Sequence, residues 1–385
     1  MLAKLKRLNW VMLAAAVALV IVGTLTIYSA GNARTEKIFH GLWINNLVTA
    51  VFGFMIYFVI AFVDYRKIMA YLSAPIYGMA VILLVAVLLI GTDRFGGRRW
   101  LFFFQPSEIA KLCVILFLAA VVPKLKGVVG FCIALAIVGV PVLLILLEPD
   151  LGTALALVPA CVLIMFAARV WRRGLMVMLV SGFLFTAMLL GVIGVAERPG
   201  VSPERRERIM RFVPLKHHQV KRVKTFIYPE EDRLGAGYTL RQAKIAIGSG
   251  GFFGRGFGKG EANHLKYLPP AISINDFIFC VYAEETGFVG SLVLLFLFGL
   301  LLVPGGWVAF RCDDTSGRLL VIGITTLIFA HVFVNIGMSV GLVPITGVPL
   351  PFISSGRTFL VTVMAGLGLI QSVSVYGKEN PRWES

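Results

Sequence analysis

The stretch DFIFCVYAEETGFVGSLVLLFLFGLLLV, residues 276–303, joins an acid to an apolar run that is long enough to cross a bilayer as a helix. It follows a polar, Gly-rich segment, residues 196–275, which carries 15 Lys and Arg residues against 7 Asp and Glu residues. A carboxylate at a membrane boundary is costly unless water, a partner or a task accounts for it. Because Asp276 faces a basic segment, the pattern indicates chemistry on an anionic, lipid-linked substrate.

The rest of the chain has the composition of a membrane scaffold. Hydrophobic residues make up 58% of the 385 residues, against roughly 45–50% in globular domains. Ten apolar runs, most of them near the length that a spanning helix needs, lie at 9–30, 41–63, 73–90, 107–122, 128–147, 151–168, 175–195, 276–303, 319–340 and 355–375. The sequence therefore predicts an all-α integral membrane protein of about ten transmembrane helices, with one polytopic domain over residues 1–385. The first run is too long, and too poor in a cleavage site, for a removable signal peptide.

The short loops predict the orientation. With the N-terminus in the cytoplasm, the inner loops and termini hold fourteen Lys and Arg residues and the short outer loops hold five, which is the bias of the positive-inside rule. Long loops are exempt from this rule. We therefore expect residues 196–275 to form a large extracytoplasmic loop between the seventh and eighth helices that contains part of the active site, with both termini cytoplasmic.

The net charge of +16 does not indicate nucleic-acid binding, because the loop bias and the excess of cations in segment 196–275 account for it. A cationic surface at a bilayer favours anionic lipid headgroups or pyrophosphate. The five cysteines show no metal-binding spacing such as C-x-x-C and no convincing pair for a disulfide. We interpret them as packing residues.

Two ionisable groups lie one turn into the fourth run. Glu108 and Lys111 are spaced i and i+3, after a Pro and a Ser that favour a helix start. One interpretation is an internal ion pair that steadies the helix end. The other is that both groups line a cavity, which is the default reading of charges inside a membrane.

Candidate phosphate ligands precede this run, and candidate helix caps come later, after the fifth run. Arg98 and Arg99 offer planar guanidinium groups suited to phosphate, although an interfacial anchor explains the adjacent Trp100 well. Asp150 and Thr153 are both able to cap the helix that follows them. For Asp150, capping and a role in the cavity stay open.

The basic segment contributes Arg222 and Lys244 as candidate ligands of pyrophosphate. Residues 202–213 read as an amphipathic helix on the outer membrane surface. The glycines of residues 248–260 are able to cradle phosphate through backbone N–H groups, but a flexible surface loop explains them as well. They follow no strand, so a nucleotide-binding fingerprint is rejected.

Further polar groups accompany the last spans. Glu284 and Glu285 continue the helix that Asp276 opens, and at least one of them is expected to face the bundle interior. Ser354 lies in a Pro-punctuated outer loop before the last span. Arg357 is either a snorkelling anchor or a cation of the cavity.

Several motifs, in order along nearly the whole chain, resemble a known family. They are Gln105-Pro-Ser-Glu-x-x-Lys111, Pro149-Asp-Leu-Gly-Thr153, Gln242-Ala-Lys-Ile-Ala-Ile-Gly-Ser-Gly-Gly251, Asp276-Phe-Ile-Phe-x-x-x-Ala-Glu-Glu285, Asn335-Ile-Gly337 and Gly347-Val-Pro-Leu-Pro351. The combination is similar to the SEDS family (shape, elongation, division and sporulation), most closely to its RodA branch.

This resemblance implies a glycosyltransferase of the bacterial inner membrane that polymerises lipid II into glycan strands for elongation and rod shape. It implies a class B penicillin-binding protein as the partner that crosslinks the strands. It also implies an essential acid at Asp276, with Glu108, Lys111 and Asp150 around a central cavity. The predicted substrate-binding residues are Arg98, Glu108, Lys111, Asp150, Arg222, Lys244 and Ser354.

The expected mechanism leaves two roles open for Asp276. It either accepts the proton of the acceptor sugar hydroxyl or holds a divalent cation, Mg²⁺ or Mn²⁺, that neutralises the leaving pyrophosphate; no organic cofactor is expected. The rival functions are a lipid II flippase, whose interior charges and short spans would be similar, a division-specific FtsW-type paralogue, and a scaffold for the transpeptidase.

Overall fold

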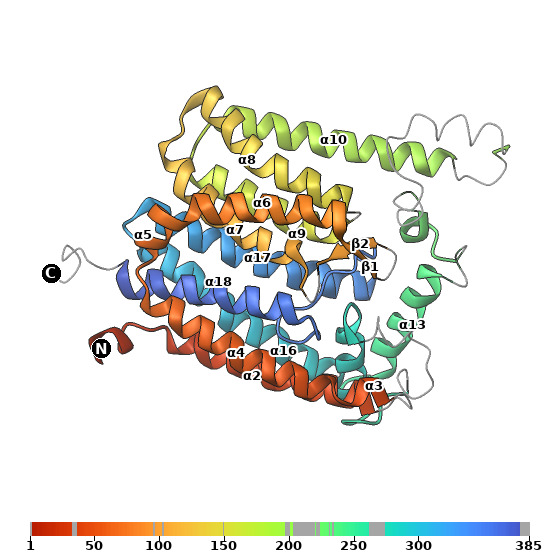
Figure 1. Cartoon of the computed structure of the whole chain (residues 1–385). Coiled ribbons are helices and arrows are strands. Elements are labelled where there is room, and N and C mark those ends of the chain that lie inside the picture. Colours follow the sequence, from red (N-terminus) through yellow and green to blue (C-terminus); the bar gives the residue numbers. More distant parts are fainter. Residues whose placement is uncertain are drawn as a thin grey trace.

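Figure 1 shows the computed structural model of the chain, a bundle of membrane helices. The structure describes residues 2–32, 37–94, 97–101, 104–148, 150–196, 201–202, 220, 224–230, 232, 235–261 and 274–377. The amphipathic helix predicted from Ser202 onward lies outside this described part, apart from its first residue.

The described chain is almost entirely helical, as predicted. Its long helices are α2 (Trp10–Asn32), α4 (Leu42–Phe62), α6 (Ser73–Ile90), α7 (Pro106–Val121), α8 (Gly127–Leu147), α9 (Leu151–Ala167), α10 (Arg172–Ala196), α13 (Ala236–Ser249), α16 (Ile278–Arg311), α17 (Thr315–Val340) and α18 (Arg357–Tyr376). The short elements are α1 (Leu2–Leu5), α3 (Lys37–His40), α5 (Tyr65–Lys67), the π turn η1 (Ile68–Leu72), the 3-10 turn η2 (Val122–Lys124) and the antiparallel strands β1 (Thr92–Arg94) and β2 (Gly97–Trp100).

The ten predicted spans are confirmed as helices. Within the described residues, nine helices or helical segments have the length and composition to cross a membrane, and α9 is a shorter apolar helix. Helices are expected here because backbone N–H and C=O groups have no water to bind inside a bilayer. Successive spans alternate in direction, so the two termini lie at one end of the bundle and α13 and the β1–β2 hairpin lie at the other (Figure 1).

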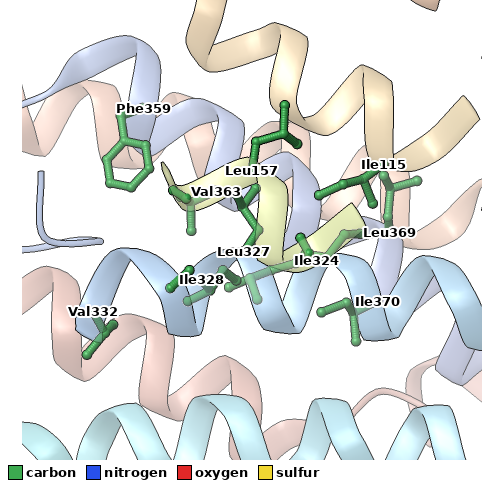
Figure 2. Packing of buried hydrophobic residues seen from close by; sticks show 14 of the residues in the cluster. Ile115, Leu157, Ile324, Leu327, Ile328, Val332, Phe359, Val363, Leu369 and Ile370 are labelled. Atoms are coloured by element: carbon green, nitrogen blue, oxygen red, sulfur yellow. The ribbon is translucent and has the colours of Figure 1, made fainter. Parts of the chain in front are cut away.

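The centre of the bundle is made by α7, α9, α17 and α18. Ile115, Leu157, Ile324 and Phe359, one from each of these helices, lie in the same buried cluster (Figure 2). Small residues bring the helices close together, as is usual in membranes: a β-carbon on Gly323 of α17 would lie 2.5 Å from Ile164 of α9. The short spans α7 and α9 are thus buried among neighbours, whereas α10 lies at the periphery and exposes most of its apolar side chains (Figure 1).

Helix α16 is broken at Gly287, where φ is 71° and ψ is −162°. The break frees backbone groups that an intact helix would pair internally, and a glycine strap, defined here as residues 250–261, pairs with them. The N–H groups of Arg255 and Gly256 donate to the carbonyls of Glu284 and Glu285 at 3.0 Å each. In return, Phe288 N–H donates to Gly251 O at 3.0 Å and Val289 N–H to Phe252 O at 3.1 Å. The backbone of the glycine strap is therefore hydrogen-bonded to a membrane helix.

This pairing corrects the interpretation of the glycines as a phosphate cradle, which needs free N–H groups. The segment does lie at the surface, as the other interpretation expected, because most of residues 251–259 are exposed, but its backbone is hydrogen-bonded to the bundle. Here the N–H groups of Arg255 and Gly256 are used by α16, and a β-carbon on Gly254 would lie 2.1 Å from Glu285 O. Glycine is needed at position 254 because the strap backbone approaches α16 there too closely for a side chain.

We expect Gly287→Ala to release the strap and to lower thermal stability. This combination of positive φ and extended ψ is nearly exclusive to glycine and costs a residue with a β-carbon about 1–3 kcal/mol, and that carbon would lie 2.3 Å from the backbone N of Gly254. Gly299→Ala, in the same helix but with open space around it, is the matched control and should leave the melting temperature in detergent unchanged. Equal melting temperatures for both variants would contradict the structural role of the strap.

Candidate functional site

Asp276 lies two residues before α16, at the end of the bundle that carries α13. Its side chain is half-buried, and the N-terminus of α16 beside it favours a negative charge. The side-chain amide of Asn335 in α17 donates to the backbone carbonyls of Asp276 at 2.8 Å and of Val348 at 2.7 Å. Asn335 therefore fixes Asp276 to the loop that connects α17 to α18.

That loop passes directly beside the carboxylate. A β-carbon on Gly347, whose φ is 73°, would lie 3.3 Å from Oδ2 of Asp276. Ser354 tightens the same region, because its hydroxyl accepts from Leu350 N–H at 2.8 Å and donates to Asn275 O at 2.6 Å. Both contacts are made to backbone groups, so the buried Ser354 holds Asn275, the residue next to Asp276. The predicted contact of Ser354 with substrate stays a prediction.

Asp150 lies on the other side of the same loop. A β-carbon on Gly152, at the start of α9, would lie 2.7 Å from Thr346 O. The Asp150 carboxylate caps α9 by accepting from Thr153 N–H at 3.1 Å and from the Thr153 hydroxyl at 2.8 Å, and it also accepts from Gln105 Nε2 at 3.0 Å. Capping is confirmed for Asp150. The start of α7, the start of α9 and Asp276 are thus grouped around one loop.

Arg99 of β2 links the hairpin to this group. Its Nη1 lies 3.9 Å from Asp150 Oδ1, and its Nε donates to Glu148 O at 3.3 Å. The side chain of Glu148 is fully buried, and neither of its carboxyl oxygens has a hydrogen-bond partner within the described chain. An unpaired buried carboxylate is unfavourable. Burial, reinforced by the nearby charge of Asp150 and opposed by Arg99, raises the pKa of Glu148 to about 8.

This raised pKa predicts a pH-dependent stability. In the unfolded chain Glu148 has the usual pKa of glutamate, about 4.3. In the folded protein its pKa is about 8. Between these values the folded state binds more protons, so stability falls as pH rises through this window. We expect Glu148→Gln to melt at an increasingly higher temperature than wild type from pH 5 to pH 9. A constant difference between Glu148→Gln and wild type across this range would contradict the raised pKa.

Glu108 and Lys111 form the predicted pair inside α7. Lys111 Nζ lies 2.8 Å from Glu108 Oε2, and both side chains are buried. The same ammonium lies 2.8 Å from Nε2 of His331 in α17. Since the ammonium only donates, His331 Nε2 accepts, and its Nδ1–H is directed at Pro349 O, 3.3 Å away. A charged pair in α7 is therefore joined through a neutral histidine to the loop beside Asp276.

Two cations of the basic segment form ion pairs within it. Arg241 pairs with Glu230 at 3.4 Å, and Arg255 pairs with Glu261 at 2.6 Å. Lys244 of α13 is exposed, and its amine lies against Gly341, the C-cap of α17, where a positive charge is favourable. Its role in substrate binding stays a prediction.

Glu284 and Glu285 both face the interior, as expected for at least one of them. Glu285 accepts a short hydrogen bond from the Ser29 hydroxyl of α2. Glu284 accepts from Glu261 N–H at 2.9 Å and from Ser249 Oγ at 3.4 Å. These carboxylates connect the broken helix to α2, to α13 and to the glycine strap.

The outcome for the other predicted residues is mixed. The side chain of Arg98 and the whole of Arg222 lie outside the described residues, and Arg357 is exposed at the start of α18. Sequence reasoning did not assign His331 to the site. A lone histidine in an apolar run carries no distinctive signal, although its spacing of four residues before Asn335 places both on one face of a helix.

The described residues contain no group of three or more His, Cys, Asp or Glu side chains that would hold a metal ion. The divalent cation predicted at Asp276 therefore stays a prediction. This arrangement supplies one half-buried acid at the bundle end, held by Asn335 and backed by a buried polar network.

A sequence model of the FtsW/RodA/SpoVE family, with the description "Cell cycle protein", matches residues 9–379. The chain belongs to this family. The resemblance inferred from the motifs is thereby confirmed, as is the class of the fold.

Individual members of the FtsW/RodA/SpoVE family match over most of the chain. The peptidoglycan glycosyltransferase MrdB of Escherichia coli is 39% identical over 315 residues, which cover 79% of this chain and 78% of MrdB. The crystal structure of RodA of Thermus thermophilus has a TM-score of 0.67 at 27% identity and covers 97% of this chain and 98% of its own. A chain of a peptidoglycan synthase complex, from work on the coordination of polymerization and crosslinking, has a TM-score of 0.76 at 28% identity and covers 97% and 99%.

Proposed function

We propose that this protein is a peptidoglycan glycosyltransferase that polymerises lipid II into glycan strands during cell elongation. The observation that carries the proposal is the half-buried Asp276, held at the bundle end by Asn335 and placed beside Gly347. MrdB of Escherichia coli, a relative of this protein, is named a peptidoglycan glycosyltransferase. The likeness to MrdB and to RodA favours elongation over division, although the family also includes proteins of the FtsW type.

In the proposed reaction, Asp276 acts as a general base. Asp276 accepts the proton of the 4-hydroxyl of the acceptor sugar while that oxygen attacks the anomeric carbon of the donor. The new glycosidic C–O bond forms as the bond to the diphosphate breaks, and undecaprenyl diphosphate leaves with the electron pair. A single positioned base contributes about 10²–10⁴-fold to the rate. The predicted metal role of Asp276 is a second proposal and is not needed for this step.

The substrates are lipid II and the growing undecaprenyl-diphosphate-linked glycan. Their tails lie in the membrane, and cations at the outer surface, including Lys244 and the predicted Arg98 and Arg222, attract the diphosphates. We propose a class B penicillin-binding protein as the partner that crosslinks the product. The likeness to a chain of a peptidoglycan synthase complex supports this assembly.

Polymerisation and flipping are distinguished by removing the bilayer. Purified protein in detergent micelles, with its transpeptidase partner and fluorescent lipid II, should produce a ladder of glycan polymers on a gel. A flippase has no membrane to act across under these conditions. Absence of polymer, together with transfer of lipid II across the bilayer of proteoliposomes, would replace the proposal with the flippase.

The topology is part of the proposal: both termini are cytoplasmic, and the segment 196–275 is outside, in the bacterial inner membrane. We expect a membrane-impermeant maleimide to label Glu230→Cys in intact cells and to label Asp313→Cys only after lysis. Exposed Cys132 is replaced by serine in both proteins. Labelling of Asp313→Cys in intact cells would invert the orientation.

A further inference from the structure

A pocket lies at the terminal end of the bundle, opposite Asp276, with a volume of about 370 Å³. Its walls are the segment Lys6–Val11, the end of α16 and the end of α18. This size falls within the range of about 300–1,000 Å³ that is typical of small-molecule sites. No part of the proposed reaction uses it.

The segment that forms one wall is held in place by α18. Asn9 N–H donates to the Gln371 side chain at 2.9 Å, and Gln371 Nε2 donates back to Asn9 O at 2.9 Å. The Ser374 hydroxyl donates to Arg7 O at 3.0 Å. This wall of the pocket is therefore fixed before any ligand arrives, which lowers the entropic cost of binding.

The polar groups of the pocket are cationic. Lys6, Arg7 and Arg311 contribute three positive charges, and none of the described residues that line the pocket is acidic. Asp313, which follows two residues after Arg311, is exposed and is not part of the lining. The local charge favours an anion.

The remaining lining is apolar and aromatic, and much of it is exposed. Trp10 is 54% exposed and Trp307 is 53% exposed, and Val11 lies beside Trp10. Tryptophan is enriched at the depth of lipid headgroups. The guanidinium of Arg311 lies over the Trp307 ring at 4.5 Å, which holds it at the pocket wall, and its fork of N–H donors suits a phosphate group.

We propose that this pocket binds the headgroup of an anionic phospholipid from the leaflet at the terminal end of the bundle. The phosphate lies between Arg7 and Arg311, and the acyl chains run along the exposed apolar faces of α2 and α16. Basic pockets between helices on the cytoplasmic side of membrane proteins are known to take such headgroups. A lipid fits better than a soluble phosphate, because Trp10 and Val11 would then contact acyl chains.

The test is native mass spectrometry of the purified full-length protein in detergent, titrated with phosphatidylglycerol, phosphatidylcholine or inorganic phosphate. We expect one phosphatidylglycerol to be retained in preference to phosphatidylcholine. Each cation removed should weaken its binding by about fivefold, equivalent to about 1 kcal/mol. Arg7→Gln with Arg311→Gln should therefore lose about 25-fold, and the exposed Lys6→Gln, which tests the site even if the double variant fails to fold, should lose about fivefold.

The matched control is Lys124→Gln with Lys126→Gln, which removes two exposed cations at the same end of the bundle but outside the pocket. It should retain the lipid as wild type does. Equal retention by all variants, or a loss in the control as large as in the pocket variants, would overturn the site. Binding of inorganic phosphate in the concentration range of the lipid, lost in the same variants, would overturn the assignment to a lipid.

Discussion

Asp276→Asn should abolish glycan polymerisation while the protein stays folded and still binds lipid II. Asparagine keeps the size of the side chain and one acceptor oxygen but does not take up the proton of the attacking hydroxyl. The loss in rate should be at least about 10²–10⁴-fold, the contribution of a positioned base. Folding should be unaffected, because Asn335 holds Asp276 by its backbone carbonyl. Polymer gels, lipid II binding and melting temperatures measure the three quantities.

The conservative control is Asp276→Glu, which restores a carboxylate on a longer side chain. Gly347 lies close to Oδ2, so the added methylene displaces the acid and only part of the activity should return. Robust polymer from Asp276→Asn would place the chemistry elsewhere and would favour the flippase.

Lys111→Met should cause the largest loss of stability. It leaves the Glu108 carboxylate buried without its cation and removes the donor to His331 Nε2. Removing one partner of a buried ion pair costs about 3–5 kcal/mol. We expect a large fall in the melting temperature in detergent, and a loss of activity, because Pro349 and the loop beside Asp276 are tied to α7 through His331.

Neutralising both partners separates stability from function. Glu108→Gln with Lys111→Met removes both charges of this pair, so neither is left unpaired and most of the stability should return. If activity returns with it, the pair is structural; if the stable protein is inactive, the charges position the substrate or the loop. A Lys111→Met protein as stable as wild type would show that the pair is not buried as described.

The positions of the membrane helices were predictable from the sequence because they depend on local composition. A run of about 20 apolar residues is helical in a bilayer whatever its neighbours are. The start of α16 near Asp276 and the pairing of Glu108 with Lys111 follow from the same short-range rules. Capping by Asp150 was also predictable, because Thr153 is only three residues away.

The structure of the glycine strap could not be predicted from local sequence patterns. Glycines at 250–260 have the same composition in a phosphate loop, a flexible surface loop or a strap. Their function was decided by the break at Gly287, about thirty residues later, whose freed backbone groups pair with them. The ion pairs of Arg241 and Arg255 with carboxylates of the same segment were likewise decided by the tertiary structure.

The sequence by itself determined the membrane class, the ten apolar helices and the acid that opens α16, because the bilayer imposes one solution on each apolar run. Only the tertiary structure decided what surrounds that acid. His331 meets Lys111 across 220 residues of chain, and Asn335 reaches Asp276 across 59. Such contacts depend on how whole helices pack, and helix packing is set by the shapes of many side chains at once.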